Sequence, residues 1–169
     1  DIYNKFSRSN KKNIKKAMQY DLKVIQTDNY ELFIDFALQN RENYIRVNEI
    51  ILLKSIVQEG AKRNNCKLYA IFNEMNHLVT AVLFLVNSRF IHLLFSTNTR
   101  EGRKKRSLSL IINQIIEDYS HQPMILDFAG SNLPGVHFFN KGFGAVEQQY
   151  KTLIVNKLPW PLSIIKNIC

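Results

Sequence analysis

The sequence predicts an α/β fold in which a mixed, mostly antiparallel central sheet is flanked by helices. The spacing of apolar residues changes repeatedly between the helical period of about 3.6 and the strand period of two. These changes give an N-terminal helix followed by the order β-α-α-β-β-β-α-β-α-β. A second observation is a corner at residues 124–144, where a short apolar strand leads into a helix that ends at glycines. Ligands of open α/β sheets lie beyond the carboxyl ends of strands, so this corner predicts a site as well.

The first third of the chain is predicted to be mostly helical. Its elements are a helix at 9–20, a strand at 22–26 and two helices at 30–39 and 47–62. The first helix places Ile14, Ala17 and Met18 on one face, at spacings of three and four residues. The third helix turns an apolar stripe inward in the same way, made of Ile50, Leu53, Ile56 and Val57.

The middle of the chain changes to strand periodicity. Strands are predicted at 68–72, 78–86 and 90–95. The turns between them are short, which indicates an antiparallel meander. A helix at 107–119 follows, with an apolar stripe of Leu108, Ile111, Ile112, Ile115 and Ile116. Because a parallel pair needs such a crossover, we expect the strand at 124–126 to run parallel to 90–95 and to splay away from it.

The corner at residues 124–144 combines several local signals. Ser131 or Asn132 is expected to cap a helix that has Pro134 in its first turn. Gly142 and Gly144 bracket Phe143 where that helix ends. A last strand is expected at about 146–155, and the tail at 157–169 has no predicted regular structure. No internal repeat is found.

Composition narrows the class of protein. A chain of 169 residues with 46% hydrophobic and 22% charged residues is expected to form one globular domain. No apolar run reaches the length of a membrane span, and no signal peptide is recognised. Cys66 and Cys169 have no CxxC or histidine spacing, so no metal site is expected, and a reducing cytoplasm fits best. The net charge of +9 favours anionic partners.

The corner resembles the Fem-like branch of the GNAT acyltransferase superfamily. The matching residues are Asp127, Phe128, Gly130, Gly135, Phe139, Phe143 and Gly144. The resemblance implies a GNAT-like fold and transfer of an acyl group to an amine. Fem-like proteins usually carry two GNAT-like modules, and residues 6–17 resemble the basic helix that opens the second. We therefore expect 1–169 to be a single C-terminal module that lacks an N-terminal partner module.

The resemblance also implies a donor site at residues 96–107, where GNAT proteins bind the pyrophosphate of coenzyme A. The expected binding residues are Ser96, Thr97, Arg100, Gly102, Arg103, Lys104, Lys105, Arg106 and Ser107. Unpaired amides at a helix N-terminus and its dipole favour an anion, and a glycine lets backbone approach a phosphate closely. The family loop usually carries two glycines, whereas only Gly102 is present here. A merely solvated basic turn is the alternative.

Several residues could act as a general acid or base, but no two of them form a pair that is diagnostic of such a role. We expect Asp127, His137 and Tyr150 as catalytic residues, although a cap on the helix that follows is the favoured structural interpretation of Asp127. His92 lies within a strand between two apolar residues, and it is interpreted as a histidine that is buried in the core or exposed at a sheet edge. Substrate contacts are expected from Phe128, Gly130, Ser131, Asn132, Phe139 and Asn140. The phenylalanines among them have packing in the core as their default interpretation.

Three functions remain open from the sequence. The first is transfer of an acyl group from acyl-CoA, such as acetyl-CoA, to a small-molecule or peptide amine. The second is a non-catalytic module that binds RNA or another anionic partner through its basic residues. The third is the tRNA-dependent aminoacyl transfer of cell-wall synthesis known for the family. Its members place a lysine where this chain has Asn140, and Lys141 lies about 100° further round the helix.

Overall fold

The computed structural model describes residues 2–41, 45–129 and 133–149. Five strands form one sheet in the order β1-β2-β3-β4-β5. Their bounds are β1 Val24–Thr27, β2 Cys66–Phe72, β3 Leu78–Val86, β4 Phe90–Asn98 and β5 Ile125–Asp127. Neighbouring strands are antiparallel except β4 and β5, which are parallel. The predicted meander and the predicted parallel pair are thus both confirmed.

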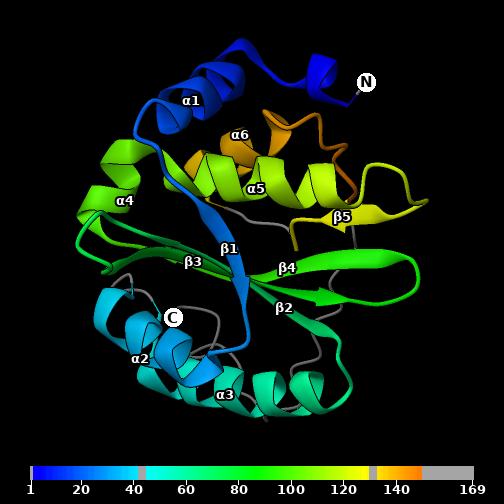
Figure 1. The fold of residues 1–169 in the computed structure, drawn as a ribbon. Coiled ribbons are helices and arrows are strands. Elements are labelled where there is room, and N and C mark those ends of the chain that lie inside the picture. Colours follow the sequence, from blue (N-terminus) through cyan, green and yellow to red (C-terminus); the bar gives the residue numbers. More distant parts are fainter. Residues whose placement is uncertain (1, 42–44, 130–132, 150–169) are drawn as a thin grey trace, which may run out of the picture.

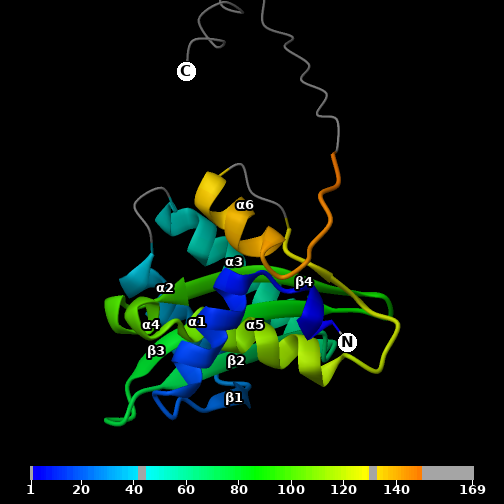
Figure 2. The same ribbon diagram turned by 90° about the horizontal axis from the view of Figure 1, so that it is seen from above.

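Helices cover both faces of this sheet. After a short 3-10 helix at Tyr3–Lys5 come α1 Arg8–Met18, α2 Tyr30–Asn40, α3 Val47–Lys62, α4 Arg100–Lys105, α5 Ser107–Asp118 and α6 Pro134–Lys141. Helices α1, α5 and α6 lie over one face, and α2 and α3 lie over the other (Figure 1). In the view from above in Figure 2, α1 and α5 lie in front of the sheet. The predicted layered α/β fold is confirmed.

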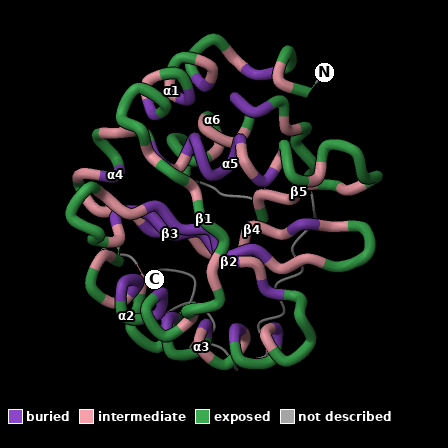
Figure 3. The backbone as a smooth tube through the Cα atoms, in the orientation of Figure 1, coloured by how far each residue is buried: buried purple, intermediate pink, exposed green. Residues whose placement is uncertain are grey.

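The sheet separates two apolar cores. Strand β3 is almost wholly buried and sends alternate side chains to each of them. Val82 and Phe84 join the core under α5, whereas Ala81 and Leu83 join the core over α3. Figure 3 shows the buried segments concentrated along the central strands and α5, with the outer sides of the helices exposed. Because both faces of β3 are buried, one against each core, its residues form a continuous apolar run in the sequence.

The N-terminal segment holds the end of α6 against the core under α5. Asn10, buried on α1, donates from Nδ2 to the carbonyl oxygen of Phe139 at 3.1 Å. The backbone N–H of Ser7 donates to the carbonyl oxygen of Gly142 at 2.8 Å. A Cβ at Gly142 would meet the Asn10 side chain within 3.0 Å, so the glycine permits this close approach. The predicted N-terminal helix therefore belongs to the domain's own packing.

Three predicted details differ from the structure. Helix α4 replaces the loop expected at residues 100–105, because the Thr99 hydroxyl caps it by accepting from the Gly102 N–H. The N-cap of α6 is Leu133, without a side-chain cap, rather than Ser131 or Asn132. Residues 146–149 of the expected last strand are described and form no strand. Residues 150–155 of that strand and the tail at 157–169 lie outside the described residues.

Candidate functional site

Strands β4 and β5 run parallel, and β5 ends at Asp127, which leaves an opening beside β4 beyond His92 in the described sheet. Their register begins at Phe90 with Ile125 and ends at His92 with Asp127, yet β4 continues to Asn98. The pairing of β4 with β3 shifts by one residue at the same place, because Leu83 pairs with Phe95 and Phe84 with Leu93. Leu94 is therefore the extra residue of a β-bulge. A bulge bends its strand and redirects backbone groups, and this one lies on the part of β4 beyond the end of β5.

A histidine–aspartate pair lies where β5 ends. The Nδ1 atom of His92 is 3.1 Å from Oδ2 of Asp127, and their side chains are 36% and 45% exposed. The other carboxylate oxygen, Oδ1, accepts the N–H of Ala129 at 2.8 Å. Ala129 has a positive φ of 57°, which is uncommon for a residue other than glycine. Asp127 thus shapes the turn after β5 and does not cap α6, which begins at Pro134.

The helix α4 and the start of α5 lie beyond the carboxyl end of β4. Arg106 joins the two helices in the left-handed conformation, with φ 61°. Ser107 then opens α5, and its buried hydroxyl donates to the Gly102 carbonyl oxygen at 2.8 Å and contacts the Thr80 hydroxyl. The N-cap of α5 carries no side-chain hydrogen bond. Its first amides and helix dipole therefore favour an anion at this junction.

Gly102 has a structural use that differs from the expected one. It is buried where α4 crosses β3, and a Cβ there would collide with the Thr80 hydroxyl and the Val79 carbonyl oxygen. The absence of a side chain thus lets α4 approach β3, and it does not open backbone to a phosphate. This contact was not visible in the sequence because it joins residues more than twenty positions apart.

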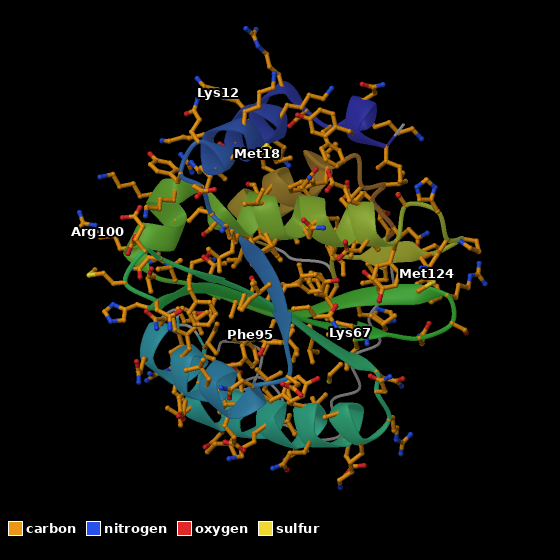
Figure 4. The ribbon with its side chains drawn as sticks, viewed as in Figure 1. Lys12, Met18, Lys67, Phe95, Arg100 and Met124 are labelled. Carbon is orange, nitrogen blue, oxygen red and sulfur yellow. The ribbon has the colours of Figure 1, made fainter. Side chains whose placement is uncertain are left out.

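The basic residues of the expected donor site divide into two groups. Arg100, Arg103, Lys104 and Arg106 are exposed. Figure 4 shows Arg100 at the outer end of α4, directed away from the sheet. Lys105 instead forms an ion pair with Glu101 at 2.8 Å, and its ammonium lies 5.7 Å from the centre of the Tyr20 ring. The hydrogen bond between these two side chains lowers the pKa of Glu101 and raises the pKa of Lys105.

Ser96 and Thr97 belong to β4 rather than to a loop. Thr97 is buried, and its hydroxyl donates to the carbonyl oxygen of Asn40 at the end of α2, at 3.4 Å. It therefore points to the sheet face opposite α5. Of the residues predicted to hold the donor, Thr97 and Lys105 serve the packing of helices, while Arg103, Lys104, Arg106 and Ser107 lie at or next to the junction of α4 and α5.

The expected substrate aromatics pack on the core under α5. The rings of Phe128 and Phe139 have centroids 6.1 Å and 5.1 Å from that of buried Phe143. His137 and Asn140 lie half-buried on α6. Gly130, Ser131, Asn132 and Tyr150 fall outside the described residues. Phe128 and Phe139 thus pack against the core, which was the default interpretation of these phenylalanines.

The contact of His92 with Asp127 was not predicted from the sequence. Asp127 was singled out, but the pairing depends on the register between two strands that are 35 residues apart. The parallel pair places the third residue of β4 beside the third residue of β5, but this register is not visible in the sequence. Asn10 was missed for the same reason, because it acts on a helix 129 residues away.

Two further classes of feature were searched for. None of the helices in the described part of the chain has the length and apolar character needed to cross a membrane. Among residues 2–41, 45–129 and 133–149, no cluster of three or more His, Cys, Asp or Glu side chains is placed to hold a metal ion. Cys66 is buried, and burial raises the pKa of its thiol.

This architecture is the fold of the GNAT acetyltransferases. No protein-family profile matches the sequence, and no curated protein does. Among solved structures, FemX matches with a TM-score of 0.67 and 11% identity over 83% of this chain and 54% of FemX. The aminoglycoside 6'-N-acetyltransferase AAC(6')-Ih from Acinetobacter baumannii matches with a TM-score of 0.58 and 6% identity over 82% of this chain and 99% of its own.

A third solved structure carries a ligand. AAC(6')-Iy, in complex with the bisubstrate analog CoA-S-monomethyl-acetylneamine, matches with a TM-score of 0.56 and 9% identity over 81% of this chain and 99% of its own. At such low identities the likeness concerns the fold. The particular activity must therefore be argued from the residues of this chain.

Proposed function

We propose that the protein is an N-acyltransferase that moves an acyl group from acyl-CoA to an amine. The opening beside β4, where β5 ends at Asp127, carries the proposal, since it lies next to an anion-favouring junction. In AAC(6')-Iy, which shares the fold, the bound analog joins CoA to an acetylated amine. The acyl chain of a donor would lie in the opening, with its phosphates at the junction of α4 and α5.

Charge at this junction suits a pyrophosphate. Arg103 and Lys104 are exposed in the last turn of α4, exposed Arg106 joins α4 to α5, and exposed Arg100 begins α4. Charge-assisted hydrogen bonds to phosphate are about twice as strong as neutral ones. The proposed donor site thus combines side-chain charge with helix amides, in place of the second glycine that GNAT loops usually have.

The opening beside β4 supplies the reaction's other requirement. In direct transfer, an amine attacks the thioester carbonyl, and negative charge develops on its oxygen. Backbone N–H groups of β4 near the bulge at Leu94 are the donors we propose for that oxygen. Asp127 lies beside the bulge, while His137 on α6 and Tyr150 remain the other proposed proton carriers.

Calorimetric titration of the purified chain tests this proposal. Acetyl-CoA is titrated in one series and uncharged tRNA in another, with CoA that lacks its 3'-phosphate as a control for non-specific phosphate binding. We expect saturable binding of acetyl-CoA that weakens as salt rises. Saturable binding of tRNA without any binding of acetyl-CoA would replace this proposal by the next one.

The second candidate is a non-catalytic module that binds RNA or another polyanion. It is favoured by the position of the segment after α1, which contacts α4. Lys105 of α4 lies over Tyr20, which follows α1 in the chain. Lys12 and Lys15 are exposed on α1 and extend the positive surface. Such a surface has no need of the opening beside β4, which is why we place it second.

A third candidate is the aminoacyl-tRNA-dependent chemistry of Fem-like proteins, with this chain as a C-terminal module. The match to 54% of FemX is the supporting observation. Asn140 stands against it, because a neutral amide stabilises developing charge less well than an ammonium does. Lys141 follows on the same helix but points about 100° away.

A further inference from the structure

His92 and Asp127 lie on the sheet face opposite the proposed donor phosphates. Their neighbours along the strands, Ile91 and Leu126, belong to the core under α5. Because side chains alternate along a strand, His92 and Asp127 point to the other face, toward α3. His92 accordingly lines a groove together with Ser55, Ile56 and Glu59 of α3.

The pair is fixed in a way that leaves one ring nitrogen available. Asp127 uses Oδ1 for the Ala129 N–H and Oδ2 for Nδ1 of His92, so its carboxylate cannot rotate freely. The Phe90 ring stacks on His92, with centroids 5.4 Å apart and an angle of 19° between the planes. A carboxylate at Nδ1 favours the tautomer with its proton on that nitrogen. Nε2 then carries the lone pair, and no hydrogen bond to it occurs among the described residues.

The groove beside His92 has room for a substrate group. Its volume is about 540 Å³, and it lies between the last turns of α3 and the hairpin that joins β3 to β4. The charged or titratable groups around His92 are Asp127 from β5, Glu59 and Arg63 from α3, and Arg89, which stacks on Phe90 in the hairpin. The Leu94 bulge, where the thioester is proposed to lie, is two residues further along β4.

We propose that this groove receives the acceptor, a primary amine, and that His92 is the catalytic base of the transfer, with Asp127 as its positioning residue. The proposal rests on the proposed acyltransferase function. The amine enters neutral, its ammonium proton having gone to solvent. Its nitrogen forms a bond to the thioester carbon and loses a proton to Nε2 of His92. The carbon–sulfur bond then breaks, and the thiolate takes up that proton, so the products are one amide and one thiol.

The test compares His92→Gln, Asp127→Asn and the matched control His121→Gln, an exposed histidine after α5. Thiol release from acetyl-CoA is followed across pH, with benzylamine and with water alone as acceptors, and acetyl-CoA affinity is measured separately. We expect His92→Gln to lower the rate about 100-fold with acetyl-CoA affinity unchanged. Asp127→Asn should lower the rate less and alter the acid limb of the pH profile, and His121→Gln should change neither.

A second readout does not depend on turnover. Nitrogen-15 NMR of the ring identifies the tautomer, and we expect protonated Nδ1 and bare Nε2 in the wild type, with a shifted tautomer population in Asp127→Asn. A wild-type ring with its proton on Nε2, or wild-type rates in His92→Gln, would overturn the assignment. A wild-type protein that binds acetyl-CoA but releases no thiol to either acceptor would overturn it too. Failure of the wild type to bind acetyl-CoA would instead reject the proposed function.

Discussion

At Gly102, helix α4 and strand β3 approach each other so closely that no side chain fits between them. We predict that Gly102→Ala destabilises the protein by about 1–3 kcal/mol, because the new methyl group must displace Thr80 or the backbone at Val79. Urea unfolding followed by circular dichroism measures the change. The control is Gly135→Ala in α6, where a Cβ meets nothing within 4 Å and alanine should gain about 0.5–1 kcal/mol. Equal stability of the two variants would contradict the close packing of α4.

The Glu101 carboxylate ties α4 to two other parts of the molecule. It bonds to Lys105 and to the Asn73 side chain, and these bonds lower its pKa. A carboxyl group whose pKa is lower in the folded state contributes stability above its unfolded pKa and loses it as the pH falls. We predict that Glu101→Gln costs about 0–1 kcal/mol at pH 7. That cost should vanish as the pH falls below the ordinary value of 4.5.

Stability curves at several pH values check the Glu101 prediction. Glu147→Gln is the matched control, since Glu147 is exposed and has no ion pair among the described residues. Its effect on the free energy of unfolding should be small at every pH. A cost for Glu101→Gln that stayed constant between neutral and acidic pH would show that the ion pair is not its source.

On the scale of elements, variants of α4 distinguish the two interpretations of residues 96–107, a phosphate-binding site or a solvated basic turn. We predict that replacing Arg100, Arg103 and Lys104 by alanine weakens acetyl-CoA binding about tenfold or more. A net hydrogen bond to a charged group is worth about 1.5–3 kcal/mol, and about 1.4 kcal/mol corresponds to tenfold. Stability should change little, because these side chains are exposed. Titration calorimetry and urea unfolding measure the two quantities.

The matched control for α4 removes the same charge from α1, through alanine at Lys12, Lys15 and Lys16. If α4 contacts the phosphates, this variant should bind acetyl-CoA nearly as well as the wild type. Equal weakening by both triple variants would mean that only the overall positive field matters. Unchanged binding by the α4 variant would leave that segment a solvated basic helix.

On the scale of the whole molecule, the two cores share one sheet and should unfold together. Ile111 on α5 and Ile50 on α3 are both fully buried, one in each core. We predict that Ile111→Val and Ile50→Val each cost about 0.5–1.5 kcal/mol. The double variant should show the sum within about 0.3–0.5 kcal/mol, since the sites do not touch. Urea unfolding should remain a single transition in all three, and a biphasic curve would show that one face unfolds alone.

Much of this architecture could be predicted because local patterns agree with the final fold. The predicted bounds of α3 and β3 match the structure, since each has a strong apolar period over many residues. The parallel pairing of β4 with β5 was also predicted, because a helix must connect parallel neighbours. Helix α4 was not, because six residues rich in charge carry no apolar period and depend on the Thr99 cap and on contact with β3.

By itself, the sequence determined the layered α/β fold and most of the order of its elements, because these follow from periods and spacings within short segments. Tertiary structure alone decided that Asp127 holds His92, that Gly102 serves packing and that Lys105 pairs with Glu101. The physical reason is that such contacts depend on strand register and helix docking. Both join residues whose separation along the chain no local pattern records.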